Sequence, residues 1–464
     1  MTNEKSLTDE IMAGLRQEVE RFVAGLDPSE ETFDQAETSS RNFATACGAV
    51  AQKSRVACLL EAQRYGSMGP RVITPSGGIA FFERYEERWV LTHLGRLRIR
   101  RAYYWDPHNN EGFIPLDERW ALDEREPSPA LRRSIGMVSA EIPFARGRRL
   151  VQQLSLVELP EKRLQESGEA VGEKLKRIKR AAAELTLPML RDASVGVPEI
   201  PESQRHGTLY VQMDGGRLNT TTEGWREPKV ATVYWGDDVV DVSTDRRCIL
   251  EKEYVAVLGD ADELAKRLWE VACRWKWWTA RRVVVLGDGA PWIWNRAADL
   301  FPDAIQILDR YHAEEHIWAV ARQLYGGVGK HKDKRGEKVA TLSAKDIKTR
   351  HWAKARVEEL EAGDVTAILE NLRQLRPKRR TAVEAVDELI DYIETNRGRM
   401  KYDKYVEQGL TVGSGTIESG IKNVVNQRMK GCGMRWAVDR AENMLHLRAA
   451  YLSDVGPGQQ LLAA

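Results

Sequence analysis

The chain has 464 residues, of which 42% are hydrophobic and 30% charged, a balance typical of a soluble globular protein with roughly two to four domains. No apolar run approaches the roughly 20 residues of a membrane helix, and the opening MTNEKSLTDE lacks the basic and apolar regions of a signal peptide, so we expect a cytoplasmic protein with no membrane partner. The net charge of +1 argues by itself against a nucleic-acid partner, and the five scattered cysteines, which form no CxxC pair, argue against a disulfide framework or a thiolate zinc site.

The N-terminal part of the chain alternates between helical and strand-like patterns. Residues 1–70 carry apolar side chains at helical spacing, which predicts a helical region. Residues 71–127 contain a strand-like stretch from Trp89 to Trp105, and the alternating arginines of its segment GRLRIRRAYYW share one face of the strand. Such a β-ribbon fits phosphate contacts, and it fits equally an edge strand kept soluble by charge. Residues 128–190 again predict short helices, which fit either a helix-turn-helix or a plain helical bundle.

The middle of the chain has an α/β pattern. A proline-containing segment over residues 186–206 predicts a domain boundary within this segment, and the α/β pattern begins after it. Within residues 205–328, three strands come in succession at TLYVQMDGG, ATVYWG and residues 253–258. Helices and strands then alternate: the expected helices cover residues 261–275, 292–300 and 314–324, and the expected strands are VVVL and AIQIL. This order predicts a mixed sheet in which three antiparallel strands precede parallel ones, which is the order of the ribonuclease H-like fold.

The remainder of the chain is predicted to be helical. Residues 329–408 are polar and lack a strand signal, so we expect an all-helical insertion whose basic clusters favour a polyanionic partner. Residues 409–455 begin with a glycine-rich turn and lead into two helices, which we assign to the α/β domain. The sequence therefore predicts a multidomain protein: a helical N-terminal DNA-binding region with a small β-ribbon, then an α/β ribonuclease H-like catalytic domain interrupted by an all-helical insertion.

Three carboxylates stand at the points of this pattern where a site is expected. Asp288 follows the apolar run VVVL between two glycines, Asp214 ends the first strand in YVQMDGG, and Glu418 begins a helix after the turn GSG. Each one alone fits a helix cap or a surface acid. Together they can share Mg²⁺, which prefers hard oxygen ligands, at the edge of the sheet where open α/β sheets bind ligands. Two metal ions in such a cluster can activate a water or a 3′-hydroxyl for attack on phosphate.

The segments QMDGG, LGDGAPWIWN with FPDAIQILDRYHAEEH, and GSGTIESG with QRMKGCGMRW resemble bacterial insertion-sequence transposases of the ISKra type, which are DDE enzymes related to the Mutator-like group. The resemblance covers most of the chain and is strongest from about residue 205 onward. It implies that Asp214, Asp288 and Glu418 are the catalytic triad and hold Mg²⁺ or Mn²⁺. It also implies that Asp309 and His312, in DRYH, contact DNA near the cleaved bond. Family members often carry a cysteine-rich segment after the YY of the N-terminal ribbon, whereas YYWDPHNNEG contains no cysteine.

These observations predict a DNA transposase that binds the terminal inverted repeats of its element through residues upstream of 200 and catalyses metal-dependent strand cleavage and strand transfer. We expect Lys422, Arg428, Lys430 and Arg435 to contact phosphates, and Trp436 either to stack on a base or to lie in the core. The expected partner is double-stranded DNA, both terminal repeats and target. Pairing two ends requires at least a dimer, and a bacterial protein of this kind associates with the nucleoid. Two alternatives stay open: a domesticated, non-catalytic DNA-binding protein derived from a transposase, and a metal-dependent nuclease without strand transfer.

Overall fold

The computed structural model describes residues 2–26, 29–155, 157–191, 197–198, 200–243, 246–326 and 343–463. The first part of the predicted insertion and of its basic cluster lies outside these described residues. The chain forms two compact units, Met1–Val171 and Gly172–Leu462. Along the described part of the chain, no helix combines the length and the apolar character needed to cross a membrane.

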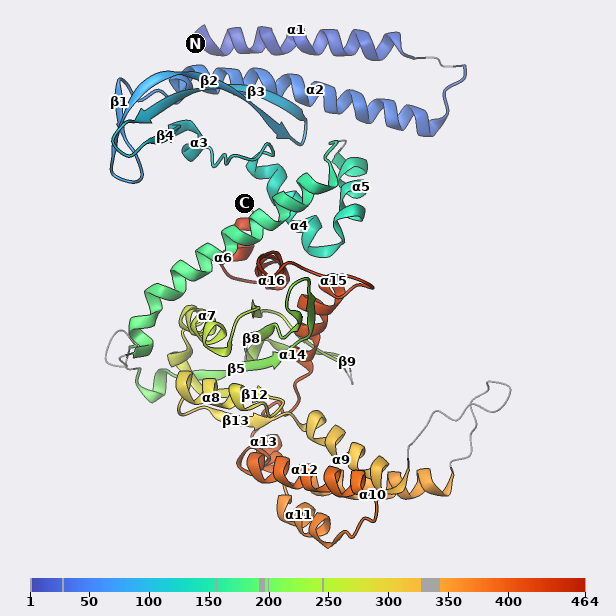
Figure 1. Ribbon diagram of the computed structural model, residues 1–464. Helices are drawn as coiled ribbons and strands as arrows, with labels where there is room; N and C mark the ends of the chain where they lie inside the picture. The colour runs from blue at the N-terminus through green and yellow to red at the C-terminus, as the bar shows by residue number, and fades with distance from the viewer. Residues whose placement is uncertain are drawn as a thin grey trace. The chain divides into compact units, whose positions relative to one another are not determined.

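The first unit joins a helical hairpin, a small antiparallel sheet and a group of helices (Figure 1). Its elements are α1 (Thr2–Ala24), α2 (Phe33–Ala62), η1 (Arg64–Gly66), β1 (Arg71–Ile73), β2 (Ile79–Thr92), β3 (Gly95–Asp106), β4 (Glu111–Phe113), α3 (Pro115–Arg119), α4 (Pro129–Glu141), α5 (Phe144–Ser155) and the start of α6 (Glu161–Arg191). The strands pair in the order β1-β2-β3-β4. The stretch from Trp89 to Trp105, expected to be strand-like, forms the end of β2, a tight turn and all but the last residue of β3. The chain turns back on itself at Gly95, whose φ is +110°.

Helix α6 continues through the segment that we expected to begin a linker at residue 186. Pro188 lies inside its last turns, and the helix ends at Arg191. Ala183 and Leu187 on this stretch are buried, and the Trp269 indole donates a hydrogen bond to the carbonyl of Thr186 at 3.1 Å. Packing against α7 therefore keeps the helix intact past the proline, at the cost of one backbone hydrogen bond.

The second unit contains the α/β elements. They are η2 (Glu202–Gln204), β5 (His206–Gly215), β6 (Leu218–Thr220), β7 (Gly224–Arg226), β8 (Lys229–Trp235), η3 (Gly236–Asp238), β9 (Val239–Ser243), β10 (Arg246–Ile249), β11 (Glu253–Val257), α7 (Ala261–Arg274), η4 (Trp277–Thr279), β12 (Ala280–Gly287), α8 (Pro291–Leu300), β13 (Ile305–Leu308) and α9 (Arg310–Tyr325). After them come α10 (Ala344–Glu361), α11 (Val365–Gln374), α12 (Arg380–Asn396), η5 (Arg397–Arg399), α13 (Tyr402–Glu407), α14 (Gly415–Gly420), the π-helix η6 (Ile421–Asn426), α15 (Gln427–Met429), α16 (Val438–Leu452) and α17 (Pro457–Ala463).

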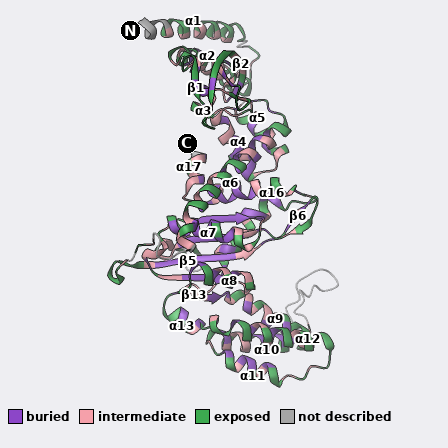
Figure 2. Ribbon diagram, turned by 60° about the vertical axis from the view of Figure 1, so that its left-hand side comes forward, coloured by how far each residue is buried: buried purple, intermediate pink, exposed green. Residues whose placement is uncertain are grey.

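The main sheet of this unit has five strands in the order β11-β8-β5-β12-β13. Strands β11 and β8 and strands β8 and β5 pair antiparallel, whereas β5, β12 and β13 run parallel. The predicted order of three antiparallel strands followed by parallel strands is therefore confirmed. Val284, Val285 and Leu286 of the internal strand β12, which lies between β5 and β13, are fully buried, as their unbroken apolar run indicated. Figure 2 shows the buried strands of this sheet in purple.

The elements after β13 are helical, as expected for the insertion. Helices α10 and α12 pack on α9, and α11 joins them (Figure 1). Helix α9 begins at Arg310, four residues before the predicted start at Glu314, because the carboxylate of Asp309 accepts the backbone N–H groups of Tyr311 and His312. The two short hairpins β6–β7 and β9–β10 were not predicted.

Candidate active site

Three aspartates lie at the same level of the sheet because the parallel strands that carry them are in register. Gln212 of β5 pairs with Leu286 of β12, so Asp214 and Asp288 each follow two residues beyond this pair. Leu308 of β13 pairs with Gly287, and the N–H of Asp309 donates to the Gly287 carbonyl at 2.8 Å. The carboxyl ends of three adjacent strands therefore each deliver one aspartate to one edge of the sheet.

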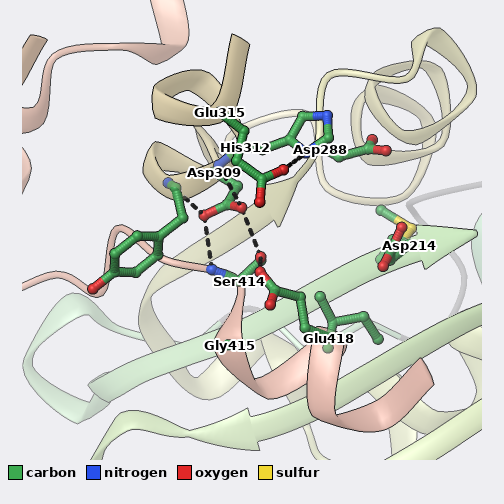
Figure 3. Close-up of a pocket in the computed structure, with 11 residues that line it drawn as sticks. Asp214, Asp288, Asp309, His312, Glu315, Ser414, Gly415 and Glu418 are labelled. Carbon is green, nitrogen blue, oxygen red and sulfur yellow. Dashed lines mark hydrogen bonds and ion pairs between the residues drawn. The ribbon is translucent and has the colours of Figure 1, made fainter. Parts of the chain in front are cut away.

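Glu418 reaches the same edge because the segment before α14 is bound to one face of β5. The hydroxyl of Tyr210 accepts the N–H of Thr411 at 3.1 Å, and the amide oxygen of Gln212 accepts the N–H of Ile417 at 3.1 Å. Side chains two residues apart on a strand share a face, so Asp214 lies on the face that this segment covers. Figure 3 shows Asp214, Asp288, Asp309 and Glu418 around a single pocket.

Ser414 links two of these carboxylates. Its hydroxyl lies 2.8 Å from Oδ2 of Asp309 and 2.7 Å from Oε1 of Glu418. A hydroxyl has only one proton to donate, so it cannot satisfy two ionised carboxylates at once. Asp309 is nearly fully buried and also accepts the N–H of Ser414 at 3.0 Å, in addition to the two N–H groups at the start of α9. It therefore joins α9 to the segment that carries Glu418.

The pocket is strongly negative, and the pKa of Asp214 records this. Partial burial, the neighbouring charge of Asp288, and the charges of Glu418 and Asp309 raise the pKa of Asp214 to about 7, although the N–H of Gly215 donates to its Oδ1 and opposes the shift. Like charges that share a site disfavour each other's ionised form. A cation in this pocket would remove that repulsion.

The loop that carries Asp288 is held from two sides. Oδ1 of Asp288 accepts the N–H of Ala290 at 2.9 Å, and the hydroxyl of Tyr392 in α12 donates to the backbone carbonyl of Asp288 at 3.1 Å. Gly289 has a φ of +105°, and a Cβ there would lie 2.9 Å from the Tyr392 ring. Only glycine meets both conditions without strain. Tyr392 in turn stacks on His316, with ring centroids 4.3 Å apart.

The residues of the pocket have the ligand chemistry of a divalent cation site. The pocket is an open cavity of about 540 Å³ whose walls include five carboxylates, those of Asp214, Asp288, Asp309, Glu315 and Glu418. Carboxylate oxygens are the hard ligands that Mg²⁺ and Mn²⁺ take. Within the described residues, no three His, Cys, Asp or Glu side chains lie close enough together to form a complete metal-binding group. In this conformation the carboxylates face a common space without meeting at one point.

The residues expected to contact DNA fall into two groups. Lys422, Lys430 and Arg435 are exposed, and His312 is half-buried in the wall of the pocket. Asp309, Arg428 and Trp436 are instead buried, and Asp309 also lines the pocket. All three side chains contact other parts of the protein. Asp309 caps α9, and the Arg428 guanidinium lies 5.3 Å from the centroid of the Trp436 ring. The Trp436 indole donates a hydrogen bond to the carbonyl of Met429 at 2.9 Å. Trp436 is a core residue, the second of its two predicted placements.

Sequence reasoning missed several residues of the site. Ser414 stands in the quoted motif GSGTIESG, but a serine in a glycine-rich turn gives no signal of a bridging role. Tyr392 lies in the predicted insertion, and its contact with the Asp288 loop has no local sequence signature. Residues 421–426 form a π-helix rather than the expected α-helical continuation after Glu418. Such π-helical turns are frequent at functional sites.

The model of an uncharacterised protein family, UPF0236, matches residues 80–341, more than half of the chain. The chain belongs to the UPF0236 family. The UPF0236 match includes Asp214, Asp288, Asp309 and His312 and ends before Glu418. No curated protein matches the chain.

Proposed function

We propose that this UPF0236 protein is a DNA transposase of the DDE type, similar to the ISKra insertion-sequence enzymes, and that its α/β unit has a ribonuclease H-like fold. The catalytic domain comprises residues 205–328 and 409–455, and the all-helical insertion comprises residues 329–408. The region before residue 190, with its β-ribbon, binds the terminal inverted repeats. Asp214, Asp288 and Glu418 are the catalytic carboxylates.

The observation that carries this proposal is the meeting of four carboxylates from separate elements at one sheet edge. Asp214, Asp288 and Asp309 follow three parallel strands in register, and Glu418 comes from a helix bound to the same face. Asp309 also caps α9, but isolated surface roles would not bring all four carboxylates into one pocket. The raised pKa of Asp214 supports the same conclusion, because burial and the repulsion of the neighbouring carboxylates both raise it and a bound cation would relieve the repulsion.

Each residue has a distinct part in this chemistry. Asp214, Asp288 and Glu418 would hold Mg²⁺ or Mn²⁺, which supplies Lewis-acid activation of a water or 3′-hydroxyl and charge stabilisation at the scissile phosphate. Asp309 acts through its contact with Ser414 as a positioning residue, because its oxygens accept four protein donors. Exposed Lys422, Lys430 and Arg435 would contact DNA phosphates and place the strand.

The test is strand transfer with DNA ends from the flanks of the gene, in Mg²⁺ or Mn²⁺. We expect the wild-type protein to join ends and the isosteric variants Asp288→Asn and Glu418→Gln to lose joining while they still bind DNA. Glu315→Gln is the matched control, since Glu315 lines the same pocket but its side chain is 80% exposed. Binding without cleavage in any divalent metal would favour the domesticated DNA-binding protein, and nicking without joining would favour a simple nuclease.

A further inference from the structure

The β6–β7 hairpin presents an exposed tryptophan between two cations. Trp225 is 57% exposed, although a large indole in water is unfavourable. The guanidinium carbon of Arg217 lies 6.0 Å from its ring centroid, and Nζ of Lys430 lies 5.8 Å from it. Neither cation takes part in an ion pair with another described residue, so both are free to meet a partner's negative charge.

The hairpin is a firm support for this side chain. Trp225 pairs with Asn219 across the hairpin, while Leu218 and Thr220 on the alternate face are buried. The backbone of Trp436 extends this pairing, because its N–H donates to the Asn219 carbonyl at 3.1 Å and its carbonyl accepts the N–H of Thr221 at 2.9 Å. The hairpin is thus bound to the chain that carries Lys430, and the exposed indole is presented from a fixed position.

Trp225 also belongs to the surroundings of the active site. Arg217 follows Asp214 by three residues, which an extended chain spans in at most about 11 Å. That length is about three base steps of a DNA strand, at 3.4 Å for each step. A strand whose phosphate lies among the carboxylates would therefore pass the hairpin within a few nucleotides.

We propose that Trp225, with Arg217 and Lys430, is a stacking platform for an unpaired base of the DNA strand beside the scissile phosphate; this rests on the proposed function. Every base has a π-face that stacks on an exposed indole, and such stacking is stronger than a cation–π contact at an exposed site. The base replaces one cation over the ring, and the displaced cation moves to a phosphate of the same strand. The hairpin thereby selects DNA whose end is opened rather than fully paired.

Binding of single-stranded DNA in EDTA tests the platform separately from catalysis. The two probes are a fluorescein-labelled oligothymidylate and an abasic oligomer of the same length and charge, followed by anisotropy. Trp225→Ala should weaken oligothymidylate binding by about 5- to 150-fold, the range measured for loss of one stacked base, and should leave the abasic oligomer unaffected. Trp225→Phe should retain most of the affinity. The matched control is Val242→Ala on the β9–β10 hairpin, where the replaced side chain is 58% exposed.

Three outcomes would overturn the platform. They are an equal loss on both probes, no loss on either, and a dimer in sedimentation that Trp225→Ala dissociates, since the indole would then be an interface between copies. The platform and the catalytic proposal can also fail separately. If the protein joins DNA ends with a divalent metal but Trp225→Ala does not change oligothymidylate binding, only the platform is refuted. Base-dependent binding without cleavage in any metal would refute only the catalytic function.

Discussion

Replacing Asp214 with asparagine should stabilise the protein, and by more at higher pH. In the folded protein the pKa of Asp214 is raised from 3.8 to about 7 by burial and by the carboxylates around it. The unfolded chain releases this proton near the lower value. Between the two values the folded state therefore holds a proton that the unfolded state has lost, and the protein loses stability as the pH rises through this window. Asparagine has the same shape and no charge, so the variant avoids this loss.

The expected change in the free energy of unfolding follows from the difference between the pKa of Asp214 in the folded and in the unfolded protein. A difference of about three pKa units corresponds to about 4 kcal/mol at 1.36 kcal/mol per unit. We expect Asp214→Asn to be more stable than wild type by about 4 kcal/mol near pH 8 and by about 2 kcal/mol near pH 5. Urea unfolding in EDTA measures both differences, and added Mg²⁺ should narrow the gap at the higher pH by binding only the wild-type folded state tightly. A variant no more stable than wild type near pH 8, or an equal gain at both pH values, would refute the reasoning.

Three further substitutions test the supports of the site and the unit. Asp309→Asn removes a buried charged acceptor, so strand joining should fall and the free energy of unfolding should drop by about 1–3 kcal/mol in thermal unfolding. DNA affinity in gel shifts should stay unchanged. Weakened DNA binding would instead indicate that Asp309 contacts DNA directly. Gly289→Ala places a side chain on a residue with a φ of +105° and should lower the free energy of unfolding by about 1–3 kcal/mol. Gly398→Ala, where an added Cβ meets no atom within 4 Å, should leave the stability unchanged. Equal effects of the two substitutions would show that backbone strain at Gly289 is not the cause. Arg274→Met leaves buried Glu253 without the guanidinium that donates to both of its oxygens, and urea unfolding should show a loss of about 3–5 kcal/mol; an unchanged midpoint would mean that the ion pair contributes nothing.

The sequence could predict the sheet and the positions of its aspartates because both depend on local patterns. A short β-branched run that ends in glycine indicates a buried parallel strand, and strand β12 has this character. Strand β5 is a mostly apolar stretch that ends in Asp-Gly. The carboxyl ends of parallel strands meet at one edge, so Asp214 and Asp288 could be brought together before any coordinates were known. Glu418 required the resemblance, since its own segment says only that a helix follows a turn.

The sequence could not decide a residue's role where distant segments determine it. Trp436 lies among basic and glycine residues, which left both base stacking and a core position open, and pairing with Asn219 in a remote part of the chain buries it. The strands of the β6–β7 hairpin have three residues each, too short to show an alternating pattern, so Trp225 escaped notice. The start of α9 is four residues earlier than predicted because the Asp309 side chain caps the helix, and the local apolar pattern does not reveal this contact.

Two tyrosine hydroxyls donate to backbone carbonyls at the ends of neighbouring strands. The hydroxyl of Tyr392 donates to the carbonyl of Asp288, and the hydroxyl of Tyr402 donates to the carbonyl of Leu308 at 3.0 Å. Both tyrosines belong to helices that follow α9, namely α12 and α13, and each holds the backbone at or next to an aspartate of the pocket. These helices therefore support the strand ends that carry the aspartates, although none of their described residues lines the pocket itself. A chimera that exchanged these helices would exchange both supports as well, so the helices and the strand ends that they hold have to be transferred together.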